Sequence, residues 1–401
     1  MYKMNQLDIL MIEQLLTSEI QNYISDHVGI KSSVLAFQKN PFPNIDFKLI
    51  INQIEAKTKA QEKLPTWFKT SGIIYPSKIS VEQTSSETTA QYKASLVSGT
   101  TLLDATGGFG IDDYYFAQKV KKVIHCELNK ELSAIVEHNF KILQAENIEC
   151  IAGDSSAVLN DLNQQFDTIY IDPSRRNDLK GKVFMLQDCL PNVPQLQDFY
   201  FNYTSKILIK TAPILDLTSG LNELRNVKTI HIVAVDNEVK ELLWEIEKNH
   251  SGQVTIKTIH FNKNEKQEFE FERNNPVIAN YSLPKKYLFE PNSAIMKSGG
   301  FHEIALFFDV DKLHVHSHLY TSNELVKFPG RVFEILHNIP YSKNEMKTFV
   351  QDTKANITTR NFPETVENIR KKWKIKDGGS TYCFFTTDKN DHKIVLICKK
   401  I

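Results

Sequence analysis

The sequence contains few cysteines, and they show no arrangement that would bind a metal or form a redox pair. The five cysteines include no C-x-x-C pair and no spacing to histidine that is typical of zinc sites. Cys126, Cys150 and Cys398 lie in or beside apolar, strand-like runs, where a free thiol packs as a small hydrophobic side chain. We therefore expect no metal and a reducing compartment.

The sequence also lacks the long apolar segments that membranes require. No apolar run approaches the roughly 18 residues that are needed to span a bilayer. The amino terminus has no basic segment leading into a continuous apolar one, and no small-residue cleavage site. We expect no membrane association and a cytoplasmic location.

Neither sign of charge is in excess. The 48 lysines and arginines balance the 48 aspartates and glutamates, so the formal net charge is zero. No long-range field draws the whole protein to nucleic acid, and any RNA contact must come from local patches. The 401 residues are 41% hydrophobic and 24% charged, which is typical of a globular protein with two or three domains.

The most informative stretch runs from residue 101 to residue 173. Short apolar runs alternate here with helical patterns, which predicts a parallel α/β sheet. Ligands of such sheets bind just beyond the carboxyl ends of the strands. An acidic residue stands at or just after the end of each run, so we expect one crevice to be lined by Asp104, Glu127, Asp154 and Asp172.

Each acidic residue has a physical role if the ligand is a nucleoside with a charged tail. Gly107, Gly108 and Gly110 suit a tight turn that lets a ligand approach the backbone, and a helix opens at about Ile111. Glu127 is placed to accept hydrogen bonds from two ribose hydroxyls. Asp154, with Ser155 beside it, can accept from an adenine amino group, and Asp172-Pro173 marks where a second substrate would meet the first.

These motifs resemble those of class I S-adenosylmethionine-dependent methyltransferases, namely DATGGFG, the strand-end glutamate, GDS and DPSRR. The longer string SVEQTSSETTAQYKA, followed by DATGGFGID and DPSRR, resembles a narrower group of bacterial methyltransferases with a THUMP-like C-terminal domain, generally described as RNA methyltransferases. Further matches lie at residues 319–322, 328–331 and 359–363, so the resemblance covers most of the chain.

The resemblance implies S-adenosylmethionine as cofactor and RNA as partner, without distinguishing tRNA from rRNA. It assigns the methionine end of the cofactor to Asp104, Gly107, Gly108 and Gly110. It also places Gln83, Ser86 and Glu87, just ahead of the first strand, over that end. The same segment has a purely structural interpretation, a helix capping box formed by Thr84 and Glu87.

A dinucleotide-binding enzyme is the first alternative. Its fingerprint needs G-x-G-x-x-G with an acidic residue about twenty positions later. The spacing to Glu127 nearly fits, but Asp113 stands where the third glycine belongs. The glycine pattern therefore favours the methyltransferase.

DPSRR sets the chemistry expected of the acceptor side. Amino-methylating enzymes follow the strand-end Asp-Pro with a second proline and an aromatic residue, whereas Ser174 and Arg175 stand here. We expect Asp172, Pro173 and Arg175 to act at the reacting centre and Ser174 and Arg176 to bind substrate. The arginines suit an RNA phosphate, or else pair with Asp172 to shape the loop.

Other residues near this edge are less informative. A uracil-C5 mechanism needs a cysteine after the fifth strand, where none occurs unless Cys189 approaches from the preceding loop. Lys210 stands at the end of the predicted fifth strand. It is either an acid/base or anion-holding group, or an ordinary surface lysine.

The predicted domains are a helical region (1–79), a Rossmann-like seven-stranded methyltransferase domain (80–263), a ferredoxin-like α+β unit (275–325) and a THUMP-like α+β domain (326–401). We expect a helix at 239–246, between a sixth strand at 229–235 and a seventh at 254–261, with the last two strands antiparallel. The helical region is either a structural accessory or a substrate-guiding arm.

Two patterns in the C-terminal part could serve ligands. Lys371, Lys372 and Trp373 combine cations with an aromatic residue, which favours RNA binding, although such a run is equally often a solvated helix face. His314, His316 and His318 alternate as on one face of a strand, but no carboxylate motif for a metal accompanies them.

Two further functions stay open beside an RNA methyltransferase. The departure at Ser174 and Arg175 fits an RNA-binding protein with a non-catalytic cofactor pocket. The second open function is a methyltransferase that acts on small molecules or proteins. This function would leave the C-terminal module without an RNA role.

Overall fold

The fold was analysed in a computed structural model, which describes residues 12–175, 185–263 and 265–401. Two compact units are present. The first runs up to Val227 and includes Trp244–Ser251, and the second comprises Lys228–Leu243 and Gly252–Ile401. No helix in these described ranges is long and apolar enough to cross a membrane.

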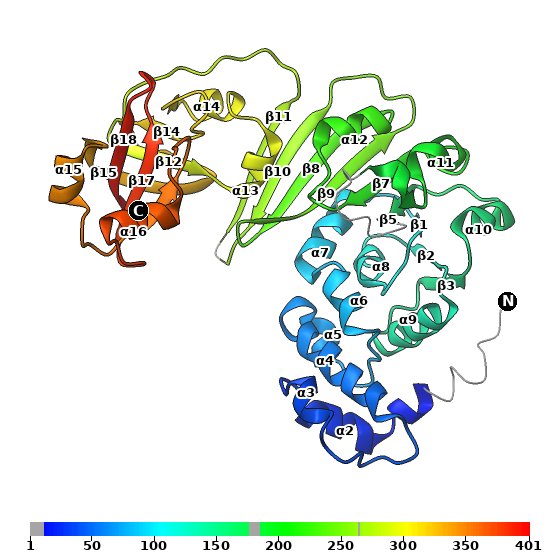
Figure 1. The fold of residues 1–401 in the computed structure, drawn as a ribbon. Coiled ribbons are helices and arrows are strands. Elements are labelled where there is room, and N and C mark those ends of the chain that lie inside the picture. The colour runs from blue at the N-terminus through cyan, green and yellow to red at the C-terminus, as the bar shows by residue number, and fades with distance from the viewer. Residues whose placement is uncertain (1–11, 176–184, 264) are drawn as a thin grey trace. The chain divides into compact units, whose positions relative to one another are not determined.

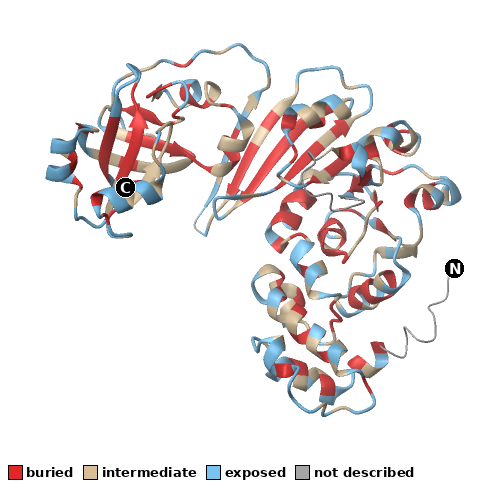
Figure 2. Cartoon of the chain, viewed as in Figure 1, coloured by how far each residue is buried: buried red, intermediate tan, exposed pale blue. Residues whose placement is uncertain are grey.

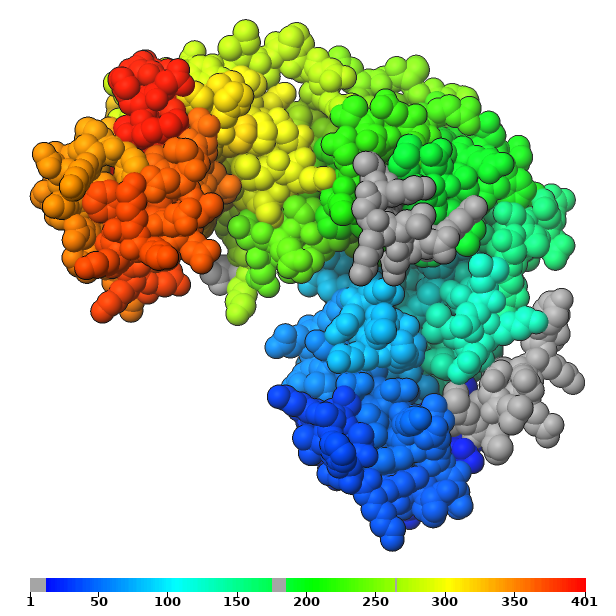
Figure 3. All heavy atoms as spheres, viewed as in Figure 1, coloured from blue at the N-terminus to red at the C-terminus, as the bar shows by residue number. Residues whose placement is uncertain are grey.

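Helices build the first part of the first unit (Figure 1), and in Figure 3 their blue surface forms one continuous lobe. They are α2 (Ser18–Asp26), α3 (Ser32–Leu35), α4 (Phe47–Lys63), α5 (Pro65–Lys69), α6 (Lys78–Gln83) and α7 (Glu87–Leu96). The apolar faces of α2, α3 and α4 share one core with Ile74 and Ile135. This core joins the helical region to the sheet that follows.

Two buried amides fix the link between the helical region and the sheet. Gln53 of α4 donates to the carbonyl of Tyr75 at 2.7 Å and accepts from its amide at 2.9 Å. Asn139 forms the same reciprocal pair with Ile74, at 2.8 and 2.9 Å. Since buried amides are costly unless paired, these contacts hold residues 74–75 in one position. They support the structural interpretation of the helical region.

A parallel sheet forms the rest of the first unit, in the order β9-β7-β4-β1-β2-β3. β1, β2, β3, β4 and β7 all pair in parallel. Their bounds are β1 (Thr101–Asp104), β2 (Lys122–Glu127), β3 (Ile148–Ala152), β4 (Thr168–Ile171), β7 (Lys206–Thr211) and β9 (Glu238–Glu247), of which Trp244–Glu247 belong to this unit. The parallel α/β fold predicted from the sequence is confirmed.

Helices connect these strands, as parallel pairing requires. They are α8 (Ile111–Phe116), α9 (Lys130–Ile142), α10 (Ser155–Leu162), α11 (Val193–Tyr200) and α12 (Leu217–Glu223). A short antiparallel pair, β5 (Ser174–Arg175) with β6 (Cys189–Leu190), and a 3-10 turn at Leu186–Asp188 follow β4. From β1 the chain goes to β2 and β3 on one side and later to β4 and β7 on the other. The switch point between β1 and β4 is where such sheets bind ligands.

The second unit begins with strands paired in the order β11-β10-β8-β9. The remaining strands are β8 (Val227–Val235), β10 (Thr255–Phe261) and β11 (Lys266–Glu272), and Glu238–Leu243 of β9 belong here. The helix expected at 239–246 is therefore wrong, because these residues form a strand. The antiparallel pairing expected of 229–235 with 254–261 is also wrong, since β8 and β10 pair in parallel.

A second sheet follows in this unit, in the order β13-β14-β12-β15-β18-β17-β16. Its strands are β12 (Tyr287–Pro291), β13 (Asp311–Lys312), β14 (Tyr320–Ser322), β15 (Gly330–Pro340), β16 (Asn356–Thr359), β17 (Thr381–Thr387) and β18 (Lys393–Lys400). Its helices are α13 (Ser293–Ser298), α14 (Glu303–Phe307), α15 (Lys343–Phe349) and α16 (Val366–Trp373). Strands such as β4 in the first unit and β8 in the second are mostly buried, whereas β3, β11 and β16 are mostly intermediate or exposed (Figure 2).

Candidate cofactor and acceptor site

All four strand-end carboxylates line one cavity of the first unit. The cavity has a volume of about 860 Å³ and is bordered by Asp104, Glu127, Asp154 and Asp172. Asp104 and Glu127 end β1 and β2, and Asp154 and Asp172 follow β3 and β4. The cavity therefore lies at the carboxyl edge of the sheet, around the switch point between β1 and β4.

The loop after β1 packs closely against its neighbours because its glycines have no side chains. The Gly107 amide donates to the carbonyl of Cys126 at 2.8 Å, and a Cβ at Gly107 would stand 2.2 Å from ring atoms of His125. Gly107 and Gly108 line the cavity. Gly110 does not: at φ +74° it caps the start of α8, and a Cβ there would meet Phe140 of α9 at 2.5 Å. Gly110 thus acts by packing rather than by facing the ligand.

Glu127 is held by the backbone on both sides. One carboxylate oxygen, Oε2, accepts from the Gly108 amide at 2.9 Å, and Oε1 accepts from the Asn129 amide at 2.7 Å. Each oxygen can accept further hydrogen bonds. The carboxylate is therefore preoriented toward the cavity while keeping room for two hydroxyl donors.

Asp154 and Ser155 begin α10. The Asp154 carboxylate caps this helix, with Oδ1 accepting from the amides of Ser156 at 3.0 Å and Ala157 at 3.1 Å. Its Oδ2 makes no hydrogen bond within the described residues and can accept from a ligand amine. Ser155 is buried beside it and also lines the cavity.

Asp104 belongs to a buried polar group beneath the glycine loop. Its Oδ1 accepts from the Thr106 amide at 2.8 Å. Behind it, Oδ2 of Asp113 in α8 lies 2.6 Å from Nδ1 of His125, and both side chains are fully buried. Burial, followed by the neighbouring Asp113 carboxylate, raises the pKa of Asp104 well above its usual value. Burial also lowers the pKa of His125.

Asp172 stands on the opposite side of the switch point and is paired with Lys210. The Lys210 ammonium, at the end of β7, forms an ion pair with Oδ2 of Asp172. The Asp172 amide donates to the Thr106 hydroxyl at 2.6 Å, and that hydroxyl lies 3.2 Å from Oδ1 of Asp104. Thr106 thus connects the Asp104 carboxylate with the backbone amide of Asp172 across β1 and β4.

The rest of DPSRR is only partly at the cavity. Ser174 is exposed and lines it, whereas Pro173 is buried and does not. The backbone of Arg175 pairs with Cys189 in β5 and β6. Arg176 lies outside the described residues, so its expected substrate contact stays a prediction.

The segment ahead of β1 does reach the cavity, through Ser80, Gln83, Thr84 and Ser85. The predicted capping box is wrong, because Ser86 caps α7 by accepting from the Thr89 amide at 3.2 Å. Glu87 is also not over the ligand space, since its carboxylate accepts from the amide and hydroxyl of Thr66 at 2.6 and 2.9 Å.

A buried network that sequence reasoning missed fixes this entry segment. Asp112 of α8 accepts from the hydroxyls of Ser85 at 2.9 Å and Tyr170 at 2.8 Å. The fully buried ammonium of Lys93 lies 3.2 Å from the Asp112 carboxylate and donates to Ser85 at 3.0 Å. Lys210, which the sequence suggested as an acid/base or anion-holding group, does reach the cavity and lies one residue before the end of β7.

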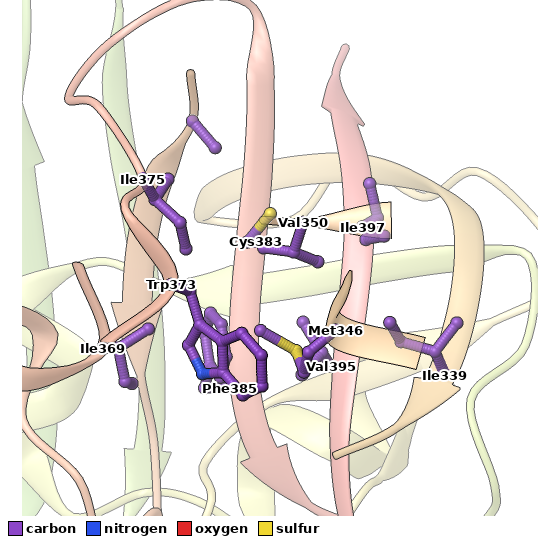
Figure 4. Packing of buried hydrophobic residues seen from close by; sticks show 11 residues of the cluster. Ile339, Met346, Val350, Ile369, Trp373, Ile375, Cys383, Phe385, Val395 and Ile397 are labelled. Atoms are coloured by element: carbon purple, nitrogen blue, oxygen red, sulfur yellow. The ribbon is translucent and has the colours of Figure 1, made fainter. Parts of the chain in front are cut away.

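The predicted RNA-binding run lies on α16 in the second unit, and its three residues differ. Lys371 is exposed. Lys372 pairs with Glu364 at 3.0 Å. Trp373 packs in the core with Met346 and Val395 (Figure 4) and is only 8% exposed. The expectation that Trp373 stacks on a base is therefore corrected: its ring belongs to the core, and its indole N–H donates to the Tyr341 hydroxyl at 3.1 Å.

The three alternating histidines lie on a loop. Residues 313–319 connect β13 to β14, so the predicted strand is wrong at His314, His316 and His318. Within the parts of the chain that the structure describes, no group of three or more histidine, cysteine, aspartate or glutamate side chains could hold a metal.

Sheet topology and cavity together define a class I methyltransferase, for which S-adenosylmethionine is the cofactor. The family profile of a ferredoxin-like domain matches residues 287–329, and that of a THUMP domain-like family matches residues 330–400. Both matches fall in the module that the sequence predicted to be ferredoxin-like and THUMP-like.

A solved structure of a proposed methyltransferase from Porphyromonas gingivalis W83 superposes with a TM-score of 0.85. It is 30% identical, and the alignment covers 97% of this chain and 98% of that one. This chain belongs to the family of that methyltransferase.

A curated relative is similar over a shorter region. An uncharacterized RNA methyltransferase of Clostridium acetobutylicum is 34% identical over 79 residues, which are 20% of this chain and 17% of the relative. The matched region thus spans less than a fifth of that relative's length.

Proposed function

We propose that the protein transfers a methyl group from S-adenosylmethionine to RNA. The observation that carries this proposal is the single cavity bordered by Asp104, Glu127, Asp154 and Asp172. Three of these carboxylates suit the methionine, ribose and adenine parts of the cofactor, and the fourth suits an acceptor. A cytoplasmic location also stays a prediction.

Cofactor binding would use acceptors that the fold has already oriented. The Glu127 carboxylate, fixed by two backbone amides, would take the ribose hydroxyls. Asp154 would accept from the adenine amine through Oδ2, and Gly107, Gly108 and Asp104 would border the methionine end. Preorganised partners lower the entropic cost of binding.

On the acceptor side, Asp172 would orient the nucleophile. Methyl transfer is an in-line displacement at a sulfonium, so the protein contributes mainly by positioning the attacking atom about 3–3.5 Å from the methyl carbon. Lys210 occupies Oδ2 of Asp172. Oδ1 has no hydrogen-bond partner among the described residues and can accept from an N–H or O–H of the acceptor.

RNA as the acceptor is supported by the THUMP domain-like module and by the name of the curated relative. Lys371 remains an exposed cation on α16 and a candidate phosphate contact. Lys372 is less available because it pairs with Glu364. For Arg175 and Arg176 we keep the proposal that they bind an anionic part of the substrate.

Binding and transfer are tested separately with Asp172→Asn. We expect calorimetry to give the same S-adenosylhomocysteine affinity for wild type and variant, because Asp172 faces the acceptor. Transfer of radioactive methyl to total cellular RNA should fall by about 10²–10⁴-fold, the usual contribution of a positioned proton-accepting group. Asp161→Asn, which removes an exposed carboxylate on α10, serves as the matched control.

Digestion of the labelled products identifies the acceptor. Label that disappears with ribonuclease and survives protease supports the proposal. Label in protein or in small molecules would contradict RNA as the substrate, and cofactor binding without any transfer would favour a non-catalytic pocket. No binding of either cofactor form, with or without RNA, would overturn the methyltransferase assignment.

A further inference from the structure

A cluster of cationic and imidazole side chains lies in the second unit, outside the cavity described above. We call it the Lys312 cluster, and it comprises Lys312, His316, His318 and Arg360. Lys312 ends β13, the two histidines belong to the loop 313–319, and Arg360 directly follows β16. Arg360 and its neighbours 361–363 form one of the sequence motifs that the proposed catalytic site leaves unused.

Lys312 is a buried ammonium without an ion pair among the described residues. It is 1% exposed, and the nearest hydrogen-bond acceptor of Nζ is the Val315 carbonyl at 3.4 Å. Nζ also lies 5.5 Å from the centre of the Phe301 ring. Among the described residues, no carboxylate forms an ion pair with it, although buried charges are normally paired. Burial lowers its pKa to about 8, and the Glu303 carboxylate nearby opposes this shift in part.

His318 packs on the same aromatic ring as Lys312, and one of its ring nitrogens has no hydrogen-bond partner in the described structure. Its ring stacks on Phe301 with centroids 3.6 Å apart, and its backbone is left-handed at φ +50°. Nδ1 is buried and has no hydrogen-bond partner in the described structure. Burial, then the charges of Lys312 and Arg360, lower the pKa of His318 to about 4. Lys312 and His318 thus share the Phe301 ring, and the Arg360 segment reaches the same loop because the Asn361 side-chain amide lies 2.9 Å from Nδ1 of His314.

Arg360 adds an excess of positive charge. Its Nη2 lies 3.0 Å from the buried carboxylate of Glu290, which also binds Arg331. One carboxylate thus serves two guanidinium groups. The Nε of Arg360 is buried and has no hydrogen-bond partner within the described residues. The Nε–H of Arg360 and Nδ1 of His318 thus lack the partners that burial normally demands, and the Lys312 ammonium has only a long contact to the Val315 carbonyl within the described residues.

We propose that the Lys312 cluster is an anion site that takes a phosphate group. A phosphate offers several strong acceptor oxygens, which suits guanidinium and ammonium donors together. The group can come from the RNA backbone, in which case the inference rests on the proposed function, or from free phosphate. A backbone phosphate bound here would help to hold the RNA on the second unit.

The alternative is that Lys312 only supports the loop 313–319 through the Val315 carbonyl. Lys312→Met separates the two, since methionine keeps the length of the side chain and removes its charge. If the lysine is kept for a ligand, the variant should be at least as stable as wild type in phosphate-free buffer, because an unpaired buried charge is unfavourable. A purely structural lysine predicts a lower unfolding temperature.

The first measurement is thermal unfolding of the full chain with inorganic phosphate, against chloride at equal ionic strength. Phosphate should raise the unfolding temperature of the wild type but not of Lys312→Met. Lys347→Met, an exposed α15 lysine without an ion pair among the described residues, should respond as wild type does. His318→Gln replaces the ring that stacks on Phe301 beside Lys312 and should weaken the response, which keeps the test valid if Lys312→Met does not fold. Equal phosphate responses in wild type and both cluster variants would overturn the site.

The second measurement identifies the source of the phosphate. In salt titrations of RNA binding, Lys312→Met should lower the slope of log K against log salt by about 0.7–0.9, one phosphate contact, while Lys347→Met serves as the control. S-adenosylhomocysteine affinity should not change. If phosphate stabilises the protein but Lys312→Met leaves the salt dependence of RNA binding unchanged, the RNA backbone is not the source of the phosphate. Free phosphate is then the ligand. A phosphate response in a protein that binds no RNA would refute the proposed RNA substrate and leave the anion site standing.

Discussion

Replacing Glu127 with glutamine tests the cofactor assignment at the residue with the best-defined geometry. The side chain keeps its shape, loses its charge and exchanges one acceptor oxygen for an NH2 group. In the structure each oxygen already accepts one backbone amide, from Gly108 at 2.9 Å and Asn129 at 2.7 Å. Glutamine can accept from only one of these amides, so its NH2 group must face the other donor.

The loss of affinity follows from the two ribose hydrogen bonds. A hydrogen bond to a charged group contributes about 1.5–3 kcal/mol. Glutamine retains one acceptor oxygen, so the variant should lose about one such bond, which corresponds to roughly 10- to 150-fold weaker binding. The cost to folding should be smaller, because Glu127 is only half-buried and water can reach the unsatisfied amide.

Calorimetric titration of S-adenosylhomocysteine into wild type, Glu127→Gln and Glu131→Gln measures this effect. Glu131 is an exposed carboxylate in the first turn of α9, so its replacement should leave the affinity as it is. Unfolding temperatures are recorded for all three proteins. A Glu127→Gln affinity within about threefold of wild type, in a folded protein, would refute the ribose role of this carboxylate.

Two further substitutions test packing that the site and the second unit depend on. Gly107→Ala should weaken cofactor binding and destabilise the protein by about 1–3 kcal/mol, since the new Cβ would meet the buried His125 ring. At the control position Gly153, a new Cβ would have its nearest neighbour at 3.7 Å, so Gly153→Ala should be tolerated in the same unfolding and titration measurements. Trp373→Ala should cost about 3–5 kcal/mol in chemical unfolding, whereas Lys371→Gln beside it should be neutral; equal stability of the two variants would contradict the core position of Trp373.

The sequence predicted the cavity well because strand ends are local features. Asp104, Glu127 and Asp172 each follow a short apolar run, and parallel pairing brings such ends to one edge. The same rule would have given Lys210 more weight, since it lies one residue before the end of β7. It could not reveal the Asp112 network, because Ser85, Lys93 and Tyr170 come from distant parts of the chain.

The wrong predictions have physical reasons of their own. Residues 241–244 are buried on consecutive positions of β9, and a strand buried on both faces has no alternating pattern to distinguish it from a helix. At 314–318 the alternation of histidines was accidental, and a left-handed residue, His318, turns the chain instead. Trp373 follows three cations on α16, but the composition of a run does not tell which member faces the core.

The surroundings of Asp172 narrow the kind of nucleophile that the site can serve. Addition to a carbon of uracil needs a reactive thiolate, and Cys126 is the one cysteine that borders the cavity as described. Burial raises the pKa of its thiol well above the usual value, which disfavours the thiolate. Cys189 is fully buried in β6 and does not line the cavity. Asp172, with Lys210 on one oxygen, instead offers a hydrogen-bond acceptor. If Asp172 orients the acceptor as we propose, the site favours an acceptor that carries its own N–H or O–H over one that must first be activated by covalent addition.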